Sequence, residues 1–112
     1  MMLEDDPEDD AVWRALGSPM RRRLLDLLRD GPLTTGELAT HFPDLSRFAV
    51  MQHLGVLEEA KLVVARKQGR QRFNHLNAVP LRTIYERWVG TFADREAERA
   101  LAVKRFVERK ET

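Results

Sequence analysis

The chain has 112 residues, 43% of them hydrophobic and none of them Cys, which predicts one small domain without disulfides or thiolate metal sites. No apolar run approaches the roughly 18 residues of a membrane span, and the acidic N-terminus is unlike a secretory signal, so we expect a soluble, cytoplasmic protein. The formal net charge of +1 hides an asymmetry, because six of the 18 acidic residues lie among the first ten residues and leave 19 basic against 12 acidic residues in the remainder. That excess favours a polyanionic partner.

The chain begins with a segment that is too acidic and too poor in apolar groups to pack. We expect residues 1–10 to form a disordered acidic tail. An alternative interpretation is a DNA mimic that shields a basic face of the protein. A short helix should follow from Ala11 and stop at Gly17, with three apolar residues turned inward. These residues are Val12, Trp13 and Leu16.

A second helix is predicted between Ser18 and Gly31. Ser18 is a favoured N-cap, and Pro19 is tolerated in the first helical turn because its missing N–H would have no partner there. The inner face of this helix is expected to be Leu24, Leu25 and Leu28. The basic run Arg21–Arg23 is either a solvated helix face or a source of phosphate contacts, for which Arg22 is the candidate.

A helix-turn-helix pattern occupies the middle of the chain. Thr34 and Glu37 have the spacing of a capping box, so a short helix should begin there and run through His41. Pro43 then breaks the chain, and Ser46 is a favoured N-cap for the next helix. In such a pair the first helix braces against the DNA backbone while the second enters the major groove.

The helix that begins at Ser46 should have two different faces. Val50, Leu54 and Leu57 recur at i, i+4 and i+7, which predicts a buried apolar stripe. The opposite face is expected to meet the bases of DNA, through Ser46, Arg47, Phe48, Met51 and Gln52. In a major groove the two apolar members of this set suit thymine methyl groups, the amide suits adenine and the guanidinium suits guanine.

Two β-prone runs follow, Val63–Lys67 and Gln71–Leu76, joined by a turn at Gly69. They predict a β-hairpin. Five basic residues and no acidic residue lie between Lys61 and Arg72, so this hairpin should contact phosphates. The residues expected to make those contacts are Arg66, Lys67, Arg70 and Arg72.

These motifs carry a family resemblance that extends over Ala11 to Leu76. The residues that match are Leu45-Ser46, Ala49-Val50, Gln52-His53-Leu54, Val56–Ala60, Leu62-Val63 and Gly69-Arg70. The region resembles the winged-helix repressors of the ArsR/SmtB family. The resemblance implies a winged helix-turn-helix fold, mainly α-helical with a small β-hairpin wing, that dimerises through its N- and C-terminal helices.

Two positions depart from the family pattern. Met51 stands where a small polar residue is common, so the family's base contacts do not transfer directly to this position. Lys61 stands where Gly usually ends the helix. The resemblance therefore implies a positive φ at Lys61, which is unusual for a residue with a Cβ.

The C-terminal part predicts a helix with a wide apolar stripe, capped by Asn77 and kinked or ended at Gly90. We expect residues 11–92 to form the winged domain and residues 93–112 a helical extension, either a second helix or a continuation. The apolar residues at both ends of the chain exceed what a small core can cover, which predicts a dimer interface. Its expected members are Val12, Trp13, Leu16, Leu81, Ile84, Tyr85, Trp88 and Phe92.

No pattern for metal binding or catalysis is visible. In the family that the chain resembles, some members bind metal through paired thiolates in the first helix of the pair, where this sequence has Ala39 and His41. Other members use Asp and His ligands in the last helix, but residues 77–112 contain no His. His53 and His75 are likewise isolated from clustered carboxylates. We expect no metal sensing and no cofactor and, without a nucleophile and base or a phosphate loop, no enzymatic activity.

We therefore expect a sequence-specific DNA-binding transcriptional regulator, in the form of a homodimeric repressor that binds an inverted-repeat operator in double-stranded DNA. The alternative is a winged-helix module that binds another protein and not DNA. The basic hairpin and the polar Gln52 on the exposed stripe argue against this alternative. No small-molecule effector is indicated by the sequence.

Overall fold

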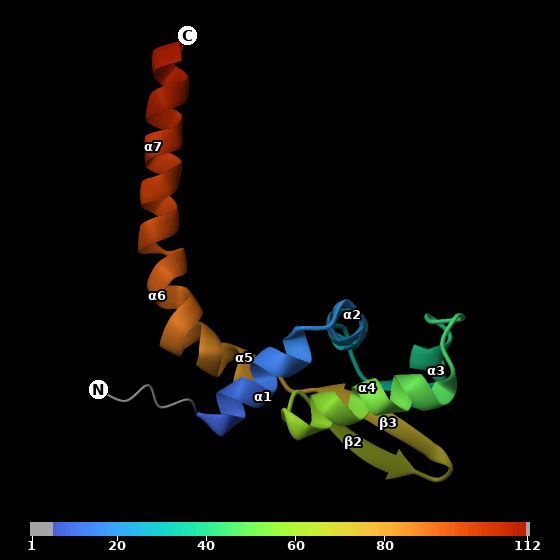
Figure 1. Ribbon diagram of the computed structural model, residues 1–112. Coiled ribbons are helices and arrows are strands. Elements are labelled where there is room, and N and C mark those ends of the chain that lie inside the picture. Colours follow the sequence, from blue (N-terminus) through green and yellow to red (C-terminus); the bar gives the residue numbers. More distant parts are fainter. Residues whose placement is uncertain (1–5, 112) are drawn as a thin grey trace. The chain divides into compact units, whose positions relative to one another are not determined.

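The computed structural model describes residues 6–111 (Figure 1). The chain divides into two compact units, and the boundary in the sequence lies between Leu81 and Arg82. The elements of the first unit are α1 (Pro7–Leu16), α2 (Pro19–Leu28), β1 (Leu33–Thr34), α3 (Thr35–Ala39), α4 (Arg47–Glu59), β2 (Val63–Gln68) and β3 (Gln71–Leu76), and α5 (Val79–Ile84) crosses into the second unit. There follow the π-helical turn η1 (Tyr85–Val89), α6 (Gly90–Ala93) and α7 (Arg95–Glu111). This is the mainly helical winged helix-turn-helix fold that the sequence predicts.

Helix α1 begins four residues before the expected start at Ala11. The carboxylate of Asp6 accepts a hydrogen bond from the backbone N–H of Glu8 (2.9 Å), and Pro7 occupies the first helical position. Three acidic residues then lie in the first turn, where the partial positive charge of the helix end stabilises them. Residues 7–10 are therefore helical and not disordered, and the remainder of the expected acidic tail, residues 1–5, lies outside the described residues.

Helix α2 begins as predicted, with the Ser18 hydroxyl accepting from the N–H of Arg21 (3.3 Å) and Pro19 in the first turn. Leu24, Leu25 and Leu28 are buried, as the spacing indicates. The core of the first unit forms where α1 and α2 pack against α4. Its largest fully buried side chains are Leu24, Leu28, Leu38, Val50, Leu54, Leu57, Leu62 and Asn74.

The sheet has three strands in the order β1-β3-β2, all antiparallel. The predicted hairpin is present, with Gln68 opposite Gln71 and Gly69 at φ 63° in the turn. The short strand β1 is an element that the sequence does not predict. It pairs with the middle of β3, where Leu33 lies opposite Asn74. This pairing connects the hairpin to the start of the helix-turn-helix.

The capping box is confirmed, since the Thr34 hydroxyl accepts from the N–H of Glu37 and the Glu37 carboxylate accepts from the N–H of Thr34, each at 3.0 Å. These bonds hold the pKa of Glu37 below its usual range. Helix α3 ends at Ala39, two residues before the expected end. Ser46 caps α4 through the N–H of Ala49 (3.1 Å), as expected.

Helix α4 ends in a reversal at Lys61, whose φ of 62° confirms the predicted positive value. The N–H of Lys61 donates to the carbonyl of Glu58 and the N–H of Leu62 donates to the carbonyl of Leu57, both at 2.9 Å. This pair of bonds is the Schellman motif, which satisfies carbonyl groups that a helix end otherwise leaves without partners. The reversal directs the chain from α4 into β2.

In the second unit, helical structure continues past Gly90 to residue 111, interrupted only at Asp94. A Cβ at position 90 would lie 2.9 Å from the Tyr85 carbonyl oxygen, so glycine permits the wide π-helical turn there.

No helix among residues 6–111 is long and apolar enough to cross a membrane. No residue from 85 to 110 is buried within this chain. Helices of this kind depend on tertiary packing for their stability.

Candidate DNA interface

The exposed face of α4 carries the five residues that the sequence assigns to base contacts. Ser46, Arg47 and Gln52 are exposed, and so are Phe48 at 69% and Met51 at 43%. The opposite face is formed by Val50, Leu54 and Leu57, which are all at most 1% exposed. Because the buried stripe fixes the rotation of the helix, the polar and apolar side chains of the other face point outward together. Two large exposed apolar groups beside a guanidinium and an amide match the mixed chemistry of base edges.

The tip of the hairpin supplies positive charge. Arg66, Lys67 and Arg70 are all exposed on β2 and the turn. Position 69, where φ is positive, is occupied by Gly, so the turn is tight and leaves these side chains free of steric strain. The tip of the wing is therefore an exposed cluster of positive charge.

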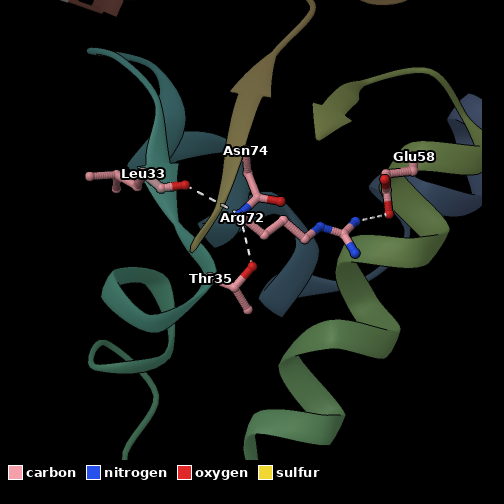
Figure 2. Close-up of polar contacts among 5 residues, drawn as sticks. All are labelled: Leu33, Thr35, Glu58, Arg72 and Asn74. Atoms are coloured by element: carbon pink, nitrogen blue, oxygen red, sulfur yellow. Dashed lines mark hydrogen bonds and ion pairs between the residues drawn. The ribbon is translucent and has the colours of Figure 1, made fainter. Parts of the chain in front are cut away.

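Arg72 differs from the other expected wing residues. Its guanidinium forms an ion pair with the carboxylate of Glu58 on α4 (Figure 2). The two side chains are about one-third exposed, and the Nε of Arg72 is buried without a hydrogen-bond partner among the described residues. Arg72 therefore lies between the wing and the helix, and the phosphate contact predicted for it stays a prediction.

Asn74 is a residue that sequence reasoning missed. Its side chain is fully buried, and its Nδ2 donates to the Leu33 carbonyl (3.2 Å) and to the Thr35 hydroxyl (3.1 Å), as Figure 2 shows. Buried amides are retained in proteins when they are hydrogen-bonded. Asn74 therefore fastens the wing to the first helix of the pair. The available signal was an Asn in the middle of a strand, a position where Asn is rare.

The arginine run Arg21–Arg23 lies in α2, and the side chains of Arg21 and Arg22 reach the C-terminal end of α1. Arg22 donates through Nη1 to the Leu16 carbonyl (2.6 Å), and Arg21 donates through Nε to the Ala15 carbonyl (2.8 Å). Cations are favoured at a helix C-terminus, where carbonyl groups lack helical partners. Arg22 therefore caps α1 through one of its nitrogens, and the phosphate contact predicted for it stays a prediction.

The residues expected at the dimer interface fall into two groups. Val12 (2% exposed) and Ile84 (5% exposed) are buried within the chain itself and so are unavailable to a partner. Leu16 and Leu81 are half-buried. The remaining four are exposed large aromatic side chains, namely Trp13, Tyr85, Trp88 and Phe92.

Metal-ligating side chains do not gather in the described part of the chain. No group of three or more His, Asp or Glu residues there could hold a metal ion. His41 is exposed, and the Nδ1 of His53 is 3.2 Å from an arginine nitrogen. The arrangement of α4 and the wing is that of a surface for binding a polyanion.

Comparisons with known proteins agree with this geometry. A helix-turn-helix domain family matches residues 16–66. The transcriptional repressor SdpR of Bacillus subtilis (strain 168) is 34% identical over 70 residues, which make up 62% of this chain and 77% of that protein. An ArsR family transcriptional regulator of known structure superposes with a TM-score of 0.70 at 32% identity, covering 75% of this chain and 90% of that one. A possible transcriptional regulator for arsenical resistance is 42% identical, with a TM-score of 0.66, over 80% of this chain and 91% of that one.

These relatives are transcriptional regulators and not enzymes. The matched region runs from the end of α1 into β2 and so contains the whole helix-turn-helix. The fold, the exposed face of α4 and the identity to these relatives together assign the chain to its family. It belongs to the ArsR/SmtB-type winged helix-turn-helix proteins, which are DNA-binding transcriptional regulators.

Proposed function

We propose that the protein is a homodimeric repressor that binds an inverted-repeat operator and does not respond to metals. The observation that carries the proposal is the outward face of α4, where Arg47 and Gln52 lie beside two exposed apolar side chains. Arginine and glutamine can each form two hydrogen bonds to one base, to guanine and adenine respectively. The name of the relative SdpR, a transcriptional repressor, supports repression as the effect on transcription.

The wing is proposed to supply affinity and not sequence preference. Arg66, Lys67 and Arg70 are exposed at its tip, and contacts from such residues to phosphates position a protein on DNA without reading bases. Arg72 is proposed to act indirectly, because its partner Glu58 belongs to the recognition helix itself. The wing and α4 would then engage DNA as one rigid surface.

The homodimer is proposed from exposed aromatic groups that a soluble monomer rarely leaves uncovered. Trp13 is exposed on α1. In the second unit the ring centroids of Trp88 and Phe92 are 5.0 Å apart in a tilted arrangement, and both side chains are more than half exposed. A second copy of the chain would cover these groups by two-fold symmetry. Two symmetric recognition helices require an operator whose half-sites are inverted repeats.

Independence from metals is proposed from the chemistry of the residues. The positions that correspond to family thiolates hold Ala39 and His41, and the last helices contain no His. A single imidazole does not make a site for zinc or for arsenite, which need several ligands in a fixed geometry. The regulator would then be governed by something other than metal binding.

The test is selection of bound sequences from random duplex DNA by the purified full chain. The expected result is an enriched inverted repeat, with half-sites one or two helical turns apart. Gln52→Ala and Arg47→Ala serve as variants on the proposed reading face, and Thr40→Ala, on an exposed position outside it, serves as the control. If the wild-type protein enriches no sequence at all, the alternative of a protein-binding module takes its place.

A further inference from the structure

The guanidinium of Arg21 joins three helices. Its Nε donates to the Ala15 carbonyl (2.8 Å) and its Nη2 donates to the Arg14 carbonyl (2.9 Å), so it caps the last turn of α1. Its Nη1 lies 3.2 Å from Nδ1 of His53 on α4. Every nitrogen of this α2 side chain is therefore engaged, two with the first helix and one with the recognition helix.

We propose that Arg21 and His53 are positioning residues for DNA binding, which hold α4 in its orientation against α1 and α2 only while His53 is neutral. The inference rests on the proposed function. Trp13, on α1, belongs to the proposed dimer interface, whereas α4 reads the bases. In a symmetric dimer the orientation of α4 relative to the interface fixes the spacing of the two half-sites. The Arg21–His53 contact, which links α4 to α1, would therefore change the affinity for DNA although it does not contact DNA.

The protonation state of His53 follows from the contact. Arg21 is a donor only and stays charged at all relevant pH values, so Nδ1 of His53 must be the acceptor and the ring proton must reside on Nε2. Protonation of Nδ1 would remove the acceptor and place two cations within hydrogen-bond distance. Burial of the ring, together with the charge of Arg21, lowers the pKa of His53 from its usual value of 6.5.

Helix α4 packs against α1, α2, α3 and β2. From α1 the Arg21 guanidinium receives the backbone carbonyls of Arg14 and Ala15, and α2 contributes Arg21 itself. Glu37 on α3 is engaged in its capping box, and the cations of β2, Arg66 and Lys67, are exposed near the hairpin tip. The residues one turn away from His53 along α4 carry no charge. They are Ala49, Val50, Val56 and Leu57.

The sign of the pH effect distinguishes positioning from simple charge. Because the pKa of His53 is lowered on folding, the contact's contribution is fully present above about pH 6.5 and is lost as the pH falls from there through the folded-state pKa. DNA affinity should fall in the same window. A histidine that merely added positive charge near DNA would have the opposite effect, since it would tighten binding as the pH falls.

The experiment measures the dissociation constant for the selected operator from about pH 7.5 to about pH 5.5 at constant ionic strength. The key variant is His53→Asn, because the asparagine Oδ1 can accept from Arg21 at the place of Nδ1 and does not titrate. His41→Asn, at an exposed position outside the contact, is the matched control. The wild type and His41→Asn should lose roughly fivefold to tenfold in affinity at the acidic end, the equivalent of one net hydrogen bond, while His53→Asn stays flat.

Titration of the free protein by NMR tests the contact without DNA. The pKa of His53 should rise in Arg21→Met, which removes the donor and its charge, and should stay nearer the wild-type value in Arg21→Lys, which keeps the charge. An unchanged pKa in Arg21→Met would overturn the inference. Equal pH profiles of DNA affinity for the wild type and His53→Asn would also overturn it. If the wild type bound DNA at no pH, the proposed function would fail, and the NMR titration would still decide the contact on its own.

Discussion

Arg72 on β3 and Glu58 on α4 form an ion pair that joins the wing to the recognition helix (Figure 2). Glu58 lies in the last turn of α4, and Arg72 lies at the outer end of the hairpin, opposite Lys67. The pair therefore holds the basic tip of the wing in a fixed relation to the base-reading face. It also explains why one of four basic wing residues is half-buried while the others are exposed.

The pair yields a prediction on stability. Arg72→Met and Glu58→Gln should each lower the free energy of unfolding by about 1–2 kcal/mol, between the small value of exposed pairs and the larger cost of breaking buried ones. Urea denaturation measures the change. In the exchanged double variant Glu58→Arg with Arg72→Glu, the loss should be smaller than the sum of the losses in its own two single variants, and additive losses would show that the two residues do not act as a pair.

The exposed wing residues predict a strong dependence of DNA binding on salt. Neutralising roughly 6–10 phosphates per complex would reduce affinity by about 10³–10⁵ between roughly 50 mM and 200 mM salt. Replacing Arg70 by Met should make the slope of log affinity against log salt shallower, by about one for each Arg70 side chain that contacts a phosphate. Arg72→Met should change the slope less. Fluorescence anisotropy at graded salt gives both slopes. Affinity that does not vary with salt would rule out a phosphate-binding wing.

Much of this arrangement could be predicted from local sequence. The caps at Ser18, Thr34 and Ser46 are each confirmed by a hydrogen bond to a backbone N–H three residues later, a relation that spacing alone reveals. The positive φ of Lys61 is also confirmed, and it was indicated by the family resemblance, because Gly usually ends the helix at this position.

The features that escaped prediction depend on contacts between distant parts of the chain. Strand β1 is two residues long and exists only because β3 lies beside it, and the amide of Asn74 finds Thr35 across 39 positions. Neither leaves a periodic pattern in the sequence. The partner of Arg72, Glu58, is 14 positions away on another element. The composition therefore indicated the positive charge of Arg72 but not its ion pair.

Gln52 is predicted to read one base pair in each half-site. Its side chain is exposed on α4, on the face opposite the buried stripe, where an amide can bond to both N6 and N7 of adenine. Gln52→Ala should cost about 1–3 kcal/mol of binding free energy and relax the preference at that one position. Competition between operator variants with single base changes measures this. Uniform weakening over all variants would identify Gln52 as a backbone contact.

Zinc, cadmium and arsenite are predicted to leave DNA affinity unchanged at micromolar concentrations. The reason is the absence of Cys from the sequence and of His from residues 77–112. Binding to the selected operator is measured with each metal and with a chelator as the matched control. Release of the operator by any of these metals would contradict the prediction and place the protein among metal-sensing members of its family.

Trp88→Glu is predicted to convert the dimer to a monomer. Trp88 is 59% exposed and its ring contacts that of Phe92 in a tilted arrangement, so a carboxylate there costs little in the isolated chain but would be desolvated in an interface. Sedimentation equilibrium should give a dimer for the wild type and a monomer for the variant, whose operator affinity should fall because each half-site is then bound separately. The matched control is Phe48→Glu, the same kind of change at an exposed aromatic on α4, which should abolish DNA binding and leave the dimer intact. A monomeric wild type would remove the dimer from the proposal, and a Trp88→Glu protein that still dimerises would remove Trp88 from the interface.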